Sequence, residues 1–184
     1  MRRCLLLVLR IAIRMRPLEF FVPSNRLSPQ GERTHVDGWN EYIKAVNTSR
    51  YTGAAREREN VTLVADYASL AMRQAAWRPP ETHCLVYVTF IERDRRRDIP
   101  NVYGRLKWVL DGLSRPRGSK CVGAGAIVDD SQKWLTVVPM VAIDRQNPGV
   151  HIKIVPVDNP AEIVQVMGMN VPIPAKTSKG VIKL

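Results

Sequence analysis

The chain has 184 residues, of which 45% are hydrophobic and 24% are charged. This length and composition suit one folded domain and exclude a disordered polycation. Because 28 Lys and Arg residues stand against 17 Asp and Glu residues, the net charge is +11, and nucleic acid is the first partner to consider, for an enzyme or for a non-enzymatic binder.

The three cysteines and three histidines are scattered along the chain. Cys4, Cys84 and Cys121 form no Cys-x-x-Cys or Cys/His pattern, which indicates reduced thiols of a cytoplasmic protein rather than a disulfide frame or a zinc site. A metal bound here is therefore expected to have oxygen ligands.

Residues 1–17 combine a basic start with an apolar run. Arg10 and Arg14 interrupt the run and no small-residue cleavage site follows, so we expect neither a signal peptide nor a membrane span, but an extension outside the fold. The domain is expected over residues 18–158, and a loosely structured tail over residues 159–184.

The first predicted elements are a short strand over residues 18–23 and a polar, turn-rich segment that extends to about residue 53. Trp39 and Tyr42 of that segment are expected to dock on the core. Apolar residues at helical spacing predict an amphipathic helix over residues 54–76. A run of β-formers then predicts a central strand, buried on both faces, over residues 84–91.

Pro100 suits the first turn of a second helix, expected over residues 100–113. Three further strands are predicted over residues 123–128, 134–143 and 150–157, and the glycine-containing first of them is also compatible with a hairpin. The predicted fold class is therefore α/β, with helices packed on a mixed sheet (α+β) in a single domain.

Two carboxylate clusters lie in strongly basic surroundings: Asp98, after three arginines, and Asp129–Asp130. If the strands at 84–91 and 123–128 run parallel, the carboxylates follow strand ends at one edge of the sheet and converge there. Such a cluster would hold Mg²⁺ against a phosphate backbone. The structural alternatives are helix capping by Asp98 and a turn at Asp129–Asp130.

Three motifs occur in this region: Arg96-Arg97-Asp98-x-x-Asn101, Leu106-Lys107-Trp108-Val109-Leu110-Asp111-Gly112-Leu113, and Ala126-Ile127-Val128-Asp129-Asp130-Ser131-Gln132. Together they resemble the RusA family of Holliday junction resolvases (crossover junction endodeoxyribonucleases). The resemblance runs from the strand at 84–91 to the strand at 150–157. It implies a dimeric, Mg²⁺-dependent endonuclease, often encoded by bacteriophages or prophages, that nicks four-way DNA junctions.

By position, Asp98 matches the first aspartate of the family's Arg-Asp-x-Asp-Asn motif, and Asp129 and Asp130 match its later aspartate pair. The resemblance implies that these three side chains bind Mg²⁺ and that Asp98 and Asp130 are catalytic. Lys107 matches the family's catalytic lysine if three residues are inserted after Asn101. A solvated helix face is the alternative for Lys107.

One departure from the family pattern is Pro100, which stands where the family has a second aspartate. Proline cannot bind a metal through its side chain. Either Glu92 or Asp94 completes the site, or cleavage is weakened and the protein binds junctions without cutting them efficiently. An RNA-associated basic protein is a third alternative, against which the lack of clustered aromatic residues argues.

Basic residues near the carboxylates are expected to hold the DNA backbone without reading bases. They are Arg95, Arg96, Arg97, Arg105, Arg115, Arg117 and Lys120. A homodimer is expected because a symmetric junction needs two nicks on opposed strands. The expected location is the cytoplasm of a bacterial or phage-infected cell, with no membrane contact.

Overall fold

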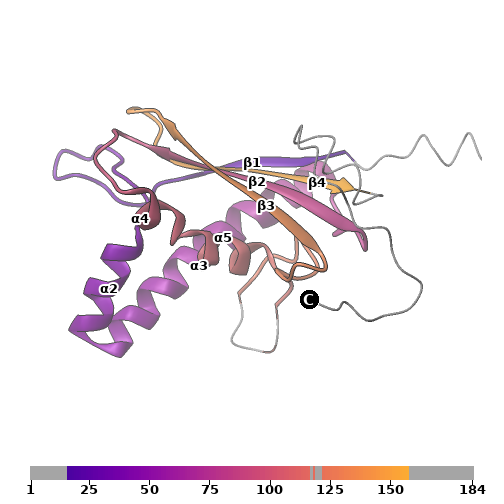
Figure 1. Ribbon diagram of the computed structural model, residues 1–184, viewed down its shortest axis with the longest axis horizontal. Helices are drawn as coiled ribbons and strands as arrows, with labels where there is room; N and C mark the ends of the chain where they lie inside the picture. The colour runs from indigo at the N-terminus through magenta and orange to yellow at the C-terminus, as the bar shows by residue number, and fades with distance from the viewer. Residues whose placement is uncertain (1–15, 117, 119–121, 158–184) are drawn as a thin grey trace, which may run out of the picture.

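The computed structural model describes residues 16–116, 118 and 122–157 (Figure 1). Its elements are β1 (Leu18–Pro23), α2 (Trp39–Thr48), α3 (Arg50–Ala75), β2 (His83–Glu92), α4 (Ile99–Tyr103), α5 (Leu106–Leu113), β3 (Leu135–Ile143) and β4 (Gly149–Val157). They form a mixed four-stranded sheet with helices, as expected of an α+β domain. Residues 1–15 of the predicted extension and the whole predicted tail lie outside the described residues.

The strands lie in the order β1-β4-β2-β3. β4 is antiparallel to β1 and β2, whereas β3 is parallel to β2. Figure 1 shows the helices on one side of this sheet. Val86, Val88 and Phe90 of β2 are completely buried in the core, but Tyr87 and Thr89 on the other face are half-buried. β2 is therefore an interior strand, as predicted, but the prediction that both of its faces are buried is wrong, because helices cover only one of them.

α2 occupies part of the segment for which turns were predicted, so that prediction is wrong there. Its apolar residues Trp39, Tyr42, Ile43 and Val46 recur at helical spacing, which is the signal that the sequence prediction overlooked. The carboxylate of Glu41 accepts a hydrogen bond from the N–H of Gly38 at 2.8 Å and closes the first turn. α2 packs on α3. α3 confirms the amphipathic helix predicted over residues 54–76, although it begins four residues earlier, at Arg50.

The helix predicted over residues 100–113 is broken into α4 and α5. The Arg105 side chain donates from Nε to the Val102 carbonyl at 2.9 Å, which satisfies a carbonyl at the end of α4. A side chain at Gly104 would collide with Trp39. The chain therefore changes direction at Gly104–Arg105, and α5 packs against α3.

The glycine-containing segment over residues 123–128 is not a strand, which corrects the prediction. Its backbone N–H groups donate instead to carbonyls at the end of α5, from Ala124 to Gly112 at 2.8 Å and from Ile127 to Leu113 at 3.2 Å. A side chain at Gly123 would overlap the carbonyls of Ser114 and Asp111, also at the end of α5. The parallel neighbour of β2 is thus β3, which begins only at Leu135.

Candidate functional site

A polar cleft of about 720 Å³ lies at the C-terminal end of β2. The loops after β1, β2 and β3 and the start of α2 supply its lining, so residues from both ends of the sequence meet there. The lining residues are Thr34, His35, Asn40, Glu41, Glu92, Arg93, Asp94, Arg96, Arg97, Asp98, Asn101 and Arg145. The contribution of Asn40 and Glu41 went unpredicted because α2 was not recognised.

Asp98 stands at the N-cap position of α4. Its carbonyl accepts a hydrogen bond from the Val102 N–H at 3.1 Å, but its side chain makes no capping hydrogen bond. The carboxylate is exposed toward the cleft and is therefore available for another role. Pro100 lies in the first turn of α4, as predicted.

The arginines of the cleft differ in their exposure and in whether they form ion pairs. The Arg96 side chain is 90% exposed, with Asp94 3.7 Å away, and Arg95 is exposed as well. Arg93 forms an ion pair with Glu32 at 2.9 Å. Of the predicted DNA contacts in this run, Arg95 and Arg96 are the ones whose charge faces outward.

Glu92 and Arg105 form a buried ion pair beneath the cleft, with side chains that are 3% and 1% exposed. Burial lowers the pKa of Arg105, and the negative charge of Glu92 acts against this effect. The Arg105 guanidinium also lies 4.6 Å from the centre of the Phe90 ring. Arg105 is thus part of the core, and its assignment as a DNA contact is wrong.

Arg97 connects this buried pair to α2. Its guanidinium is hydrogen-bonded to Glu41, lies 3.6 Å from Glu92 and donates to the Val36 carbonyl at 2.8 Å. Burial acts to raise the pKa of Glu41, but the hydrogen bond from Gly38 and the charge of Arg97 lower it overall. With 13% of its side chain exposed, Arg97 mainly positions the wall of the cleft.

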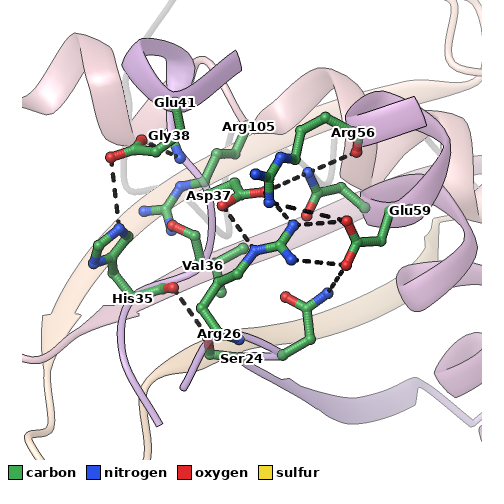
Figure 2. A network of polar contacts seen from close by, with 12 residues as sticks. Ser24, Arg26, His35, Val36, Asp37, Gly38, Glu41, Arg56, Glu59 and Arg105 are labelled. Atoms are coloured by element: carbon green, nitrogen blue, oxygen red, sulfur yellow. Dashed lines mark hydrogen bonds and ion pairs between the residues drawn. The ribbon is translucent and has the colours of Figure 1, made fainter. Parts of the chain in front are cut away.

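A second polar network holds the loop between β1 and α2 against α3 (Figure 2). Asp37 accepts hydrogen bonds from Arg26 at 2.6 and 3.0 Å and from the side-chain amide of Asn60 at 3.1 Å. Arg26 also reaches Glu59 at 2.7 Å. Since Arg56 lies 3.3 Å from Asp37 as well, this loop has a fixed position at the side of the cleft.

Lys107 of α5 lies away from the cleft, in ion pairs with one residue of α3 and one of α5. The Lys107 ammonium donates to Asp111 at 2.6 Å and to Glu57 at 2.8 Å. Burial acts to lower the pKa of Lys107, but these two carboxylates raise it overall. Lys107 is therefore a paired cation, even though its side chain is 59% exposed.

Asp130 lies in the negative potential of neighbouring carboxylates. Its pKa is raised, first by a side-chain hydrogen bond with Asp129, then by burial and by the charges of Asp129 and Asp111. The Asp130 N–H also donates to the Asp129 carboxylate at 2.7 Å, and a turn follows over residues 132–134. The aspartate pair and the Lys107–Asp111 pair are thus close enough to interact electrostatically.

The structure does not bring Asp98 to the aspartate pair within one chain. Asp98 lines the cleft with Glu92, at the C-terminal end of β2. Asp129–Asp130 precede β3, whose first residue Leu135 is opposite Cys84 at the other end of β2. A ten-residue strand separates these ends, roughly 30 Å when extended. The predicted convergence is wrong because residues 123–128 form no parallel strand.

Carboxylate oxygens are suitable ligands for Mg²⁺. In one chain, however, Asp98 is too far from Asp129 and Asp130 to bind the same ion. Among the residues that the structure describes, no three His, Cys, Asp or Glu side chains are grouped to hold a metal ion. Glu92, one alternative for completing the site, is engaged by Arg105. The other, Asp94, accepts a hydrogen bond from the Arg96 N–H at 2.9 Å.

Of the predicted DNA contacts after α5, Arg115 is exposed, while Arg117 and Lys120 lie outside the described residues. In the described part of the chain, no helix is long and apolar enough to cross a bilayer. Comparison of the sequence with protein-family models and with curated proteins gives no match. The likeness to the RusA family therefore rests on the three motifs quoted above.

Proposed function

We propose that the protein is a Mg²⁺-dependent endonuclease that nicks four-way DNA junctions, in the manner of the RusA family that its motifs resemble. The observation that carries this proposal is the electrostatic contact between the Lys107–Asp111 ion pair and the Asp129–Asp130 segment. Asp130 is sensitive to the charge of Asp111, the ion-pair partner of Lys107. This electrostatic contact across the long connection between α5 and β3 supports a common role for Lys107, Asp129 and Asp130.

The distribution of positive charge supports a DNA partner. Arg95, Arg96 and Arg115 are exposed, and the whole chain carries a net charge of +11. Exposed arginines bind phosphate groups without reading base sequence, which suits recognition of a branched shape.

A second candidate is a junction-binding protein of the same fold that has lost efficient cleavage. Two observations favour it: Asp98 lies apart from Asp129–Asp130 in one chain, and Pro100 occupies the position of a family aspartate. Binding would then depend on the arginines, and the carboxylates would be dispensable.

Cleavage of a labelled four-way junction, beside linear duplex of the same sequence, separates the two candidates. The enzyme proposal requires paired nicks in the junction with Mg²⁺, none with EDTA, and their loss in Asp130→Asn with junction affinity retained. Asp66→Asn, at an exposed position of α3, is the matched control and should cut normally. Tight binding without nicks would favour the second candidate, and absence of both would refute the two together.

A further inference from the structure

A mainly apolar groove of about 510 Å³ lies between β1 and the C-terminal half of α3. Its apolar side chains are Leu18 and Phe20 of β1 and Tyr67, Leu70, Ala71 and Ala75 of α3. The α3 members recur at spacings of three and four residues, so they form one stripe along the helix. Leu70 is 44% exposed, and Ala75 is exposed as well. The described chain therefore covers this stripe only in part.

The groove follows the free edge of β1. In the described chain β1 is the first strand in the sheet order and pairs only with β4. Successive residues of a strand point to opposite faces, and Glu19 and Phe21 line the groove together with Leu18 and Phe20, so the lining wraps around this edge. Proteins often protect an open edge with a helix or a loop. A segment in the groove would bury the stripe of α3 and shield the edge at the same time.

β4 ends beside the opening of this groove. Leu18 is opposite Ile154, so Val157 lies three residues beyond the start of β1. Val157 is also opposite His83, the first residue of β2, which follows α3 after a short connection. The end of β4, the start of β1 and the end of α3 therefore share one end of the domain. Only β1 separates β4 from the groove, so about two strand spacings, roughly 10 Å, have to be crossed, and three residues suffice.

The residues that follow β4 carry the sequence signals of a short helix. Asn159 suits the N-cap, Pro160 the first helical position and Glu162 the third. Gly168 suits the position after the last turn. These signals predict a helix over residues 160–167.

One side of this predicted helix is apolar. Ile163, Val166 and Met167 recur at spacings of three and four residues, whereas Gln165 falls on the opposite side. Eight helical residues extend over about 12 Å, which is also the length of the α3 stripe between its first and last members. The segment thus matches the groove in length and in character.

We propose that residues 160–167 form a helix that lies in the groove between β1 and α3 of the same chain. Ile163, Val166 and Met167 then pack on Leu70 and the other apolar residues of the groove, and apolar surface leaves water on both sides. Only the part of the expected tail that follows Gly168 remains outside the fold. This inference does not depend on nuclease activity.

Charge favours this segment over residues 1–14, the other apolar segment outside the described residues. Residues 158–167 contain Asp158 and Glu162 but no Lys or Arg. Arg73 and Arg78 are exposed at the end of α3, near the start of the proposed helix, so these charges attract each other. Residues 1–14 contain four arginines and no acidic residue, and they would meet the same arginines with like charge.

A thiol placed in the groove tests this inference, because a docked helix would shield it from Ellman's reagent. Leu70→Cys supplies the thiol in the full chain, with Cys4→Ser and Cys121→Ser to leave only the buried Cys84 beside it. Tyr51→Cys in the same background reports on an 82% exposed position of α3, roughly 28 Å away along the helix. The thiol of Leu70→Cys should react about tenfold more slowly than the thiol of Tyr51→Cys.

Ile163→Asp puts a charge on the apolar side of the proposed helix and should release it, so that Leu70→Cys reacts about tenfold faster. Gln165→Asp adds the same charge on the opposite side and is the matched control, which should leave the rate unchanged. Neither change should alter the labelling of Tyr51→Cys, and this excludes general unfolding as the cause.

Equal labelling rates of Leu70→Cys with Ile163→Asp and with Gln165→Asp would overturn the inference. Faster labelling with Leu9→Asp instead would assign the groove to residues 1–14. Labelling that slows as the protein concentration rises would assign it to a second copy of the chain. Either of these results would refute the docking of residues 160–167.

Discussion

The guanidinium of Arg105 and the carboxylate of Glu92 meet beneath the polar cleft, with 1% and 3% of their side chains exposed. Taking two charges out of water is costly, so such a pair contributes little net stability, but an unpaired partner is strongly destabilising. Arg105→Met or Glu92→Gln should each lower the free energy of unfolding by about 3–5 kcal/mol. In urea unfolding, the double variant should lose less free energy of unfolding than the two single variants lose when their losses are added. Strict additivity would mean that the pair is not coupled.

The hydrogen bonds and ion pairs of Asp37 should make the free energy of unfolding fall at acid pH. Burial acts to raise the pKa of Asp37, but hydrogen bonds from Arg26 and Asn60 lower it overall. A lowered carboxyl pKa contributes stability above the unfolded-state value of about 3.9, which is lost as the pH falls through the folded-state value. Asp37→Asn should remove this acid-dependent loss below about pH 4 and cost about 2–4 kcal/mol at pH 7.

Unfolding of wild type and Asp37→Asn by urea at several pH values between neutral and acid measures both effects. Asp66→Asn, on the exposed surface of α3, should change the free energy of unfolding by less than about 0.5 kcal/mol at pH 7. Equal pH slopes for wild type and Asp37→Asn would contradict the role given to this network.

Gly112 is expected to tolerate no side chain. A Cβ there would approach the side chain of Val64 and the carbonyl of Val61, where α5 crosses α3. Alanine normally stabilises a helix by up to about 1 kcal/mol over glycine, so the sign of the effect is diagnostic. We expect Gly112→Ala to destabilise the protein by about 1–3 kcal/mol, measured by thermal and urea unfolding, and a stabilised variant would disprove this close approach.

Arg96 offers a test of the DNA surface. Since its side chain is 90% exposed, Arg96→Ala should weaken junction binding without unfolding the domain. If Arg96 neutralises one phosphate, the log–log dependence of affinity on salt should lose about 0.9 from its slope. Arg78→Ala, at an exposed position beyond α3, is the control in the same fluorescence-anisotropy titration. An unchanged slope for Arg96→Ala would remove Arg96 from the interface.

The Cys84 thiol is expected to be unreactive in the folded protein. It is buried, and burial raises its pKa to about 11, so little of the reactive thiolate exists at neutral pH. In a variant with Cys4→Ser and Cys121→Ser, Ellman's reagent should label Cys84 only after denaturant is added. Rapid labelling under native conditions would mean that β2 opens readily.

The four strands and α3 were predicted to within four residues at each end. β2, β4 and α3 follow from runs of β-formers or from helical spacing, because burial against the sheet imposes those patterns. α2 was missed although Trp39, Tyr42, Ile43 and Val46 have the spacing of a helix. Polar residues between them and the absence of a side-chain oxygen at Gly38 obscured its start.

The candidate site was predicted only in part, for a different physical reason. The segment over residues 123–128 has a strand-like composition, but its backbone is used by the end of α5. That competition is tertiary and leaves no mark in the local sequence, so the end of the sheet at which Asp129–Asp130 lie was assigned wrongly. The burial of Arg105 was equally hidden, because only the folded chain brings Glu92 beneath it.

The pairing of β1 with β4 joins the first and last strands of the described chain, with Leu18 opposite Ile154. During synthesis β1 leaves the ribosome long before its partner exists, so one edge of the sheet cannot close until translation has passed β4. Contacts of such long range slow folding and expose apolar strands in the meantime. A nascent chain interrupted before β4 should therefore be a substrate for chaperones, not a smaller folded unit.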